Sequence, residues 1–383
     1  MRLSALDGLR GLFALMIVLL HLPYAFIFYD GPVVRNAFIV VDFFFVLSGS
    51  VLSLGYGERL NNLGAGLRFM ALRVGRLWPL HIFILILYLA FMAVKLGVAE
   101  LGIFQADIGP LDRVFWANFV QDTFLLHVFR NELYYTLNFP AWSISAEMLA
   151  YTVFMVGCVI GALIGGRNAM FAVVAGFGIL GLAGVIALPF GKVGIFSVLA
   201  AFFVGHFVHR LWQAHHQAGH QLPRPALCEG AYLIAFGLVL WFYRELPYAS
   251  LLAIAVFAAS VYTFAWQAGP ISRLLNTGPF QLLGERSYSI YMIHVFVLSV
   301  ISSATRIIER LLGLDLHVPA VIDGKDIDLL SLSVPGLTEL AVIIVLLLVV
   351  WVSGLTYRFI EMPGQQFARR LFSKPRQTEQ SAS

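Results

Sequence analysis

An arginine and a histidine share one face of the first apolar stretch of this chain. Arg10 and His21 are eleven positions apart in residues 7–21, which are otherwise apolar apart from Asp7. In an α-helix this separation falls about 20° short of whole turns and covers about 16 Å of the axis. Ionisable side chains are costly inside a membrane and are usually functional there. The pair therefore predicts a polar path into the membrane, with Asp7 placed to pair with Arg10.

Two acidic residues are expected inside other apolar stretches. Asp42 lies near the outer end of the second stretch, shortly before Ser48 and Gly49, and Glu147 lies within the fourth, four positions before Tyr151. Ser48 offers a hydrogen-bond donor in an apolar setting, and Gly49 allows close approach of a neighbouring backbone. Glu147 and Tyr151 share a helix face. A buried carboxylate at this position needs a partner or a proton.

A second group of candidate residues is basic or aromatic. Arg73 and Arg76 lie in residues 72–79, where we expect an inner loop beside a helix end. Guanidinium forks suit phosphate, so the pair predicts an anion site; ordinary anchoring of an inner loop is the alternative. Tyr291 and His294 lie in the ninth apolar stretch, which places His294 within the membrane.

No metal site is predicted. Cys158 and Cys228 form no disulfide framework and no metal spacing, and we expect both to be free thiols. Five histidines gather between residues 206 and 220. Because no spacing resembles a zinc helix or a di-iron bundle, we expect a solvated inner loop there.

The composition indicates a membrane protein. The 383 residues are 60% hydrophobic and 12% charged, with a mean hydropathy of +0.85. Soluble domains carry about 25% charged residues, so we expect an all-α polytopic membrane protein. The sequence pI near 9.1 is no sign of a nucleic-acid partner, because the basic residues lie at helix ends and loops, where topology accounts for many of them.

Ten transmembrane helices are expected, with both termini cytoplasmic. Ten crossings place the termini on one side, and the excess of Lys and Arg on that side predicts the cytoplasm. The start of the chain superficially resembles a signal peptide, but Arg10 and the lack of a small-residue cleavage site favour a retained first helix. The expected helices cover residues 9–29, 37–54, 77–97, 142–163, 169–188, 193–212, 230–243, 248–268, 287–306 and 338–359.

Between and after these helices we expect one short helix, a solvated loop and a polar tail. Residues 115–129 predict an interfacial or re-entrant helix, because polar side chains interrupt the apolar pattern. The acidic residues 307–337 predict a solvated outer loop. Residues 1–368 form one membrane domain, and residues 369–383 form a short polar cytoplasmic tail.

Taken together, the motifs resemble the membrane-bound acyltransferase 3 family, over almost the whole chain. The match begins at L-D-G-L-R-G (residues 6–11) and ends at E-M-P (residues 361–363). Two residues depart from the family pattern: Ser50 replaces a phenylalanine and Ile144 replaces a leucine. No hydrolase-like domain follows the last helix, so the resemblance is to stand-alone members. The family's motifs fall on Arg10 and His21, on Asp42 and residues 44–49, on Arg73 and Arg76, on Trp142, Ser143, Glu147 and Tyr151, and on Ser287, Tyr288, Tyr291 and His294.

The resemblance implies transfer of an acyl group, most often acetyl, from cytoplasmic acyl-CoA to a hydroxyl of a cell-surface or exported glycan. It implies a multi-pass protein of the bacterial cytoplasmic (inner) membrane, with acyl-CoA as donor substrate and no tightly bound cofactor. A carbohydrate or glycolipid acceptor and membrane lipids are the other expected partners. The expected catalytic residues are His21, Arg10, Glu147 and Asp42, and the expected donor-binding residues are Arg73, Arg76, Ser48, Tyr291 and His294.

Three alternatives stay open at this point. His21 can act as a general base or as a transient acyl carrier. A glycan or anion transporter, or flippase, would use the same polar path, although no inverted repeat is evident. A polysaccharide polymerase or ligase would need a large catalytic outer loop, whereas the outer loops here are modest and acidic.

Overall fold

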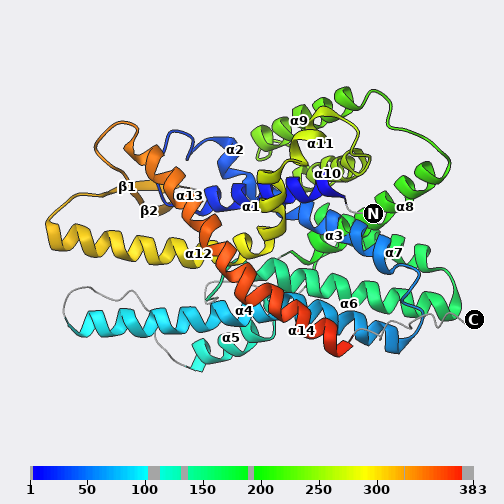
Figure 1. Cartoon of the computed structure of the whole chain (residues 1–383), viewed down its shortest axis with the longest axis horizontal. Coiled ribbons are helices and arrows are strands. Elements are labelled where there is room, and N and C mark those ends of the chain that lie inside the picture. Colours follow the sequence, from blue (N-terminus) through cyan, green and yellow to red (C-terminus); the bar gives the residue numbers. More distant parts are fainter. Residues whose placement is uncertain (1–2, 102–112, 131–136, 189–193, 323, 373–383) are drawn as a thin grey trace, which may run out of the picture.

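The computed structural model describes residues 3–101, 113–130, 137–188, 194–322 and 324–372 (Figure 1). Within these residues, eight helices are long and apolar enough to cross a membrane, and two further apolar helices are shorter. Each of the ten expected stretches overlaps one of these helices, and the all-α polytopic fold is confirmed. The number of helices that cross the membrane and the side of the termini stay predictions.

The long elements are helices that lie side by side. In Figure 1, α4, α6 and α12 run roughly along the longest axis, while α13 and α14 cross obliquely in front of them. The ten apolar helices are α1 (Ser4–His21), α3 (Val40–Tyr56), α4 (Leu63–Glu100), α6 (Ala141–Ile164), α7 (Arg167–Leu182), α8 (Ile195–Gln217), α9 (Pro225–Phe242), α10 (Ala249–Ala265), α12 (Gly278–Leu312) and α13 (Leu337–Thr356).

The remaining elements are short and connect or cover these helices. They are α2 (Pro32–Arg35), η1 (Ala37–Ile39), α5 (Arg113–Thr123), η2 (His127–Phe129), α11 (Pro270–Leu275), β1 (His317–Ile322), β2 (Lys325–Leu330), the π-helical turn η3 (Tyr357–Glu361) and α14 (Met362–Phe372). Residues 369–372 thus belong to α14, not to the tail predicted from residue 369, and residues 373–383 lie outside the described residues.

Glycines set the closest helix contacts. A Cβ atom at Gly49 of α3 would collide with the carbonyl oxygen of Phe202 on α8, and one at Gly205 would collide with that of Val46. A Cβ at Gly11 of α1 would likewise meet the backbone of α12 at Gly284. Small residues let membrane helices pack backbone to backbone. The close approach expected at Gly49 is therefore confirmed.

The first helix is shorter than expected. The predicted helix over residues 9–29 is wrong beyond His21, where α1 ends. Pro23 disfavours the helical conformation of the preceding residue and has no N–H to donate. The chain turns instead towards β2: the amide of Leu330 donates to the carbonyl oxygen of Pro23 (2.8 Å), and the amide of Ala25 donates to that of Leu330 (2.9 Å). His21 is consequently the last residue of its helix.

The predicted inner loop at residues 72–79 is also wrong. α4 continues through this segment without a break, and Pro79 lies inside the helix. α14 packs against it here: a Cβ at Gly75 would collide with the side chain of Ala368, and one at Gly364 would collide with the ring of Pro79. Local propensity alone favours a loop here, and packing against α14 stabilises the helix instead.

The acidic outer segment is not a simple loop. β1 and β2 form an antiparallel hairpin with His317 opposite Leu330, and Leu329 and Leu330 are buried. The hairpin and α2 lie at the same end of the molecule as the end of α12 (Figure 1). The predicted loop is wrong for residues 317–322 and 325–330, which form strands; most of their side chains face solvent as expected, and only Leu329 and Leu330 are buried, where they meet the chain that follows α1.

Two further segments bury polar groups. Asp122 at the end of α5 is fully buried and lies 2.9 Å from an Nη of Arg130. The helix expected within residues 115–129 exists as α5 and η2. The histidines expected on an inner loop lie mostly on α8, where His206 and His209 are buried. A solvated loop was the wrong prediction there, because α8 continues to Gln217.

Candidate functional site

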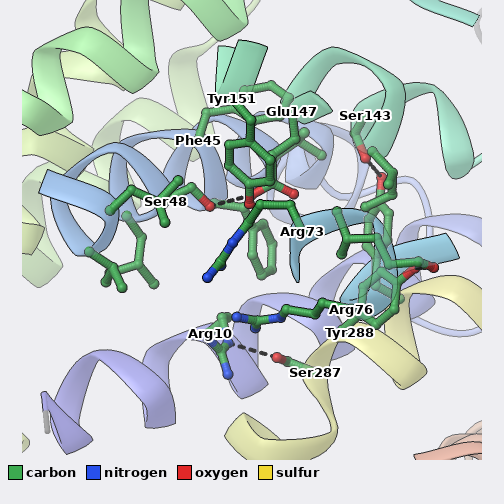
Figure 2. A pocket seen from close by; sticks show the side chains of 18 residues that line it. Arg10, Phe45, Ser48, Arg73, Arg76, Ser143, Glu147, Tyr151, Ser287 and Tyr288 are labelled. Atoms are coloured by element: carbon green, nitrogen blue, oxygen red, sulfur yellow. Dashed lines mark hydrogen bonds between the residues drawn. The ribbon is translucent and has the colours of Figure 1, made fainter. Parts of the chain in front are cut away.

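Two neighbouring cavities contain most of the predicted site residues. The first, here the arginine cavity, has about 830 Å³ of empty space, and the second, here the histidine cavity, has about 890 Å³. Val41 and Tyr291 line both cavities. Arg10 lines the arginine cavity and His21 lines the histidine cavity, so the two polar residues of α1 open into different spaces. The polar lining of the arginine cavity comprises Arg10, Ser48, Arg73, Arg76, Ser143, Glu147, Tyr151, Ser287, Tyr288 and Tyr291 (Figure 2).

Arg10 is held in place by α12. Its Nε donates to Oγ of Ser287 and one Nη donates to the carbonyl oxygen of Gly284, both at 2.8 Å. The same Nη lies 3.6 Å from the carboxylate of Asp7, which confirms the pairing expected from their spacing. Because Gly11 and Gly284 allow the two backbones to approach closely, the guanidinium reaches α12 without an intervening side chain.

The two arginines of α4 point towards the same space as Arg10 (Figure 2). An Nη of Arg73 donates to the hydroxyl of Tyr56 (3.1 Å), and its guanidinium carbon lies 5.2 Å from the centre of that ring. Among the described residues, Arg76 has no hydrogen-bond partner. It therefore presents donors to whatever occupies the cavity.

Glu147 on α6 lines the same cavity and has two hydroxyl partners. Tyr151 donates to its Oε1 at 2.5 Å, and Ser48 donates to the same oxygen. The shared face expected for Glu147 and Tyr151 is thus confirmed, and Ser48 is a second partner for this partly buried carboxylate. Three guanidinium groups and one carboxylate line this cavity, so it suits an anionic ligand.

The histidine cavity combines one imidazole with one carboxylate. Besides His21 and Asp42, its polar lining comes from Ser197, Tyr243, Ser250 and Tyr291. Ser197 on α8 donates to Oδ1 of Asp42. Phe38, Phe139 and Trp142 supply much of the apolar wall. A space with an apolar wall and a few convergent polar groups is typical of a small-ligand site.

The hydrogen bonds of His21 assign its tautomer. Its Nδ1 lies 2.9 Å from the carbonyl oxygen of Ile17, which can only accept, so this nitrogen carries the proton in the neutral ring. His294, fully buried on α12, has Nδ1 2.6 Å from the carbonyl oxygen of Tyr291 and Nε2 3.3 Å from Nδ1 of His21. By the same argument Nε2 of His294 is an acceptor. Nε2 of His21 is then left as an unprotonated nitrogen on a cavity-lining ring.

A hydrogen bond between α6 and α12 lies where the two cavities meet. Oγ of Ser143 on α6 lies 2.8 Å from the hydroxyl of Tyr291 on α12. Because Ser143 also donates to the carbonyl oxygen of Pro140 (3.1 Å), Tyr291 is the donor to Ser143. The Tyr291 side chain, which lines both cavities, is thereby fixed in the wall that divides them.

The structure groups the predicted residues differently from the sequence. Arg10 and Glu147 (expected to be catalytic) share the arginine cavity with Arg73, Arg76, Ser48 and Tyr291 (expected to bind the donor). His21 and Asp42 lie in the other cavity, and His294 lines neither. Ser50, the departure from the family pattern, is buried and also lines neither cavity.

Sequence reasoning missed several residues of the histidine cavity. Ser197, Tyr243 and Ser250 come from segments without any motif, and only their isolated polarity in apolar stretches could have drawn attention to them. Phe139 and Phe38 gave no signal at all, because aromatic residues are common throughout this chain. Within the described residues, no three His, Cys, Asp or Glu side chains gather to form a metal site.

The fold and the two cavities define a polytopic membrane protein with an arginine-lined cavity next to a histidine-lined one. A family model described as an acyltransferase domain matches residues 3–358, and the chain belongs to this acyltransferase 3 family. A curated relative, "Protein 2 in picA locus" of Rhizobium radiobacter, is 38% identical over 92 residues, which are 24% of this chain and 46% of the relative. The chain thus spans about half the length of the curated relative that it matches. No solved structure matches the chain.

Proposed function

We propose that the protein transfers an acyl group, expected to be acetyl, from acyl-CoA to a hydroxyl of a carbohydrate acceptor at the bacterial cytoplasmic membrane. One observation carries this proposal: Arg10 and His21 lie on one helix and line two cavities that share Val41 and Tyr291. An anion site beside a site for a proton acceptor is the arrangement that this transfer needs. Membership of the acyltransferase 3 family supports it.

The arginine cavity is proposed to bind the donor. Coenzyme A carries phosphate groups, and guanidinium groups bind phosphate through paired charge-assisted hydrogen bonds. Arg76 supplies donors that no described residue uses, while Arg73 and Arg10 are held by Tyr56 and Ser287. The thioester end of the donor then lies towards the wall formed by Val41 and Tyr291, which separates it from His21.

The histidine cavity is proposed to bind the acceptor hydroxyl. Nε2 of His21 takes the hydroxyl proton while the oxygen attacks the thioester carbonyl carbon and a tetrahedral intermediate forms. When the carbon–sulfur bond breaks, the sulfur leaves as thiolate and takes the proton back from His21, giving free coenzyme A and the ester. The side chain of Tyr291 must move for the two substrates to meet, since it stands between the cavities.

His294 is proposed to orient His21, in place of the donor-binding role expected from the sequence. Its Nε2 accepts from Nδ1 of His21 and keeps the other nitrogen of that ring free. When His21 is protonated at both nitrogens, the same contact stabilises the imidazolium. This arrangement supports a general-base role for His21 over a covalent acyl-histidine.

The test is acyl transfer by purified protein in detergent, followed by mass spectrometry of cell-surface glycans with and without the gene. His21→Ala should abolish transfer while its abundance in the membrane stays near that of the unaltered protein. His220→Ala is the matched control, since His220 is exposed and lines neither cavity. Full activity of His21→Ala would refute the mechanism. A protein that moves a glycan or anion without consuming acyl-CoA thioester would instead be a transporter.

A further inference from the structure

A third cavity lies beside the histidine cavity. This space, here the rim pocket, has about 710 Å³ of empty space and is lined by three separate segments: residues 30–36, residues 241–245 and the tip of the β1–β2 hairpin at Val321 and Ile322. Its polar and aromatic lining consists of Asp30, Arg35, Asn36, Trp241, Arg244 and Glu245. None of these residues belongs to the motifs that define the site described above.

The rim pocket is continuous in sequence with the histidine cavity. Asn36 and Arg244 line the rim pocket. Phe38 and Tyr243, their near neighbours in sequence, line the histidine cavity. The rings of Phe38 and Tyr243 contact each other edge to face, with centroids 5.2 Å apart. The same two segments thus build both cavities, and this aromatic pair lies between them. The two cavities are therefore close enough for neighbouring units of one ligand to reach both if these side chains move apart.

A buried amide holds the two segments of the rim pocket together. Asn36 is only 2% exposed; its Nδ2 donates to the carbonyl oxygen of Leu240 (2.8 Å), and its Oδ1 accepts from Nε of Arg244 (3.1 Å). A buried amide with both ends bonded fixes its neighbours in place. Arg244 is thereby oriented at the pocket before any ligand binds.

The lining chemistry favours a neutral, hydroxyl-rich ligand. Two arginines and two carboxylates line the rim pocket, so their charges balance, whereas three guanidinium groups face one carboxylate in the arginine cavity. Hydroxyl groups both donate and accept, and they need partners of both kinds. Trp241 is 54% exposed and offers a broad apolar face beside these charges. A sugar ring has an apolar face of C–H groups and hydroxyl groups around its edge. The flat indole suits the apolar face, and the charged side chains suit the hydroxyls.

We propose that the rim pocket binds an uncharged sugar unit of the acceptor, adjacent to the unit whose hydroxyl lies in the histidine cavity. The indole of Trp241 lies against the C–H face of this sugar, and Arg244 and Glu245 bond its hydroxyls. This inference rests on the proposed function, because it names the acceptor as a chain of at least two sugar units. It makes Trp241 a determinant of acceptor length.

The test uses oligosaccharides released by mild acid from the envelope glycan of the producing cell and separated by length. Trp241→Ala should raise KM about tenfold for fragments of two or more units and leave KM for single units and for acyl-CoA unchanged. Trp241→Phe keeps a flat ring and should recover part of the loss. Phe242→Ala is the matched control, since Phe242 is the adjacent aromatic, is 39% exposed and lines none of the three cavities.

Several outcomes would overturn the inference. An unchanged KM for long fragments would do so, and so would an equal rise for fragments of every length, as expected if a lipid headgroup occupies the pocket. Saturation-transfer NMR of the same fragments with the unaltered protein and with Trp241→Ala separates this inference from the proposed function. If no fragment is ever acylated, loss of binding in Trp241→Ala still supports the sugar site, and equal binding refutes it.

Discussion

Nε2 of His294 on α12 lies 3.3 Å from Nδ1 of His21, the last residue of α1. Through this contact α12 positions the His21 ring. The contact matters because the His21 side chain leans back over the preceding turn of α1, so a partner on another helix is needed to fix the ring against its neighbours. Ile17 supplies the second fixed partner of the same nitrogen. Together they leave Nε2 of His21 as the unprotonated nitrogen of the ring.

His294→Ala should lower kcat about tenfold to a hundredfold with little change in KM for acyl-CoA, because it removes the group that orients His21. His294→Gln should recover part of the activity, since its amide oxygen can accept from Nδ1 of His21. Steady-state kinetics in both substrates provides the measurement. A raised KM for acyl-CoA at unchanged kcat would instead assign His294 to donor binding, as the sequence predicts.

Arg76→Ala should raise KM for acyl-CoA about tenfold or more, because a hydrogen bond to a charged group contributes about 1.5–3 kcal/mol. Arg76→Lys should restore the charge but not the paired geometry, and should recover only part of this loss. Arg68→Ala is the control on the same helix, since Arg68 lines neither cavity. If KM for the acceptor rises instead, the arginine cavity is not the donor site.

Ser48→Ala should lower the melting temperature of the purified protein by a few degrees, since it removes one of the two hydroxyls bonded to Glu147. The loss of one hydrogen bond costs about 0.5–1.5 kcal/mol, since Glu147 is partly buried and keeps its bond from Tyr151. Ser50→Ala is the comparison, because Ser50 is a buried serine two positions away that lines neither cavity. Equal effects of the two substitutions would show that the carboxylate does not depend on Ser48.

Gly49→Val should reduce both the melting temperature and the abundance of the protein in the membrane. The added side chain would collide with the backbone of α8 at Phe202, and overpacking costs about 1–3 kcal/mol or more. Gly55→Val changes the same helix at a position where no described atom outside the local helix backbone lies within 4 Å of the added Cβ, and it should be tolerated. Equal tolerance of both variants, measured by thermal unfolding and immunoblotting, would contradict the packing described for α3 and α8.

The sequence alone determined the class of the fold and the local pairs. Its hydrophobic stretches require helices, because only a helix satisfies its own backbone hydrogen bonds in a membrane. Helical spacing also placed Arg10 beside Asp7 and Glu147 beside Tyr151, since residues three or four apart share a face. These relationships depend only on neighbours along the chain.

Only the tertiary structure decided which groups meet across helices. Partners such as Ser197 for Asp42 and His294 for His21 are over a hundred positions apart, and no local pattern specifies them. The same holds for the helix that continues through Pro79, which α14 covers. Arg10 and His21 share one face of α1 but line different cavities. This separation also depends on α6 and α12, because the hydrogen bond between Ser143 and Tyr291 lies between the two cavities.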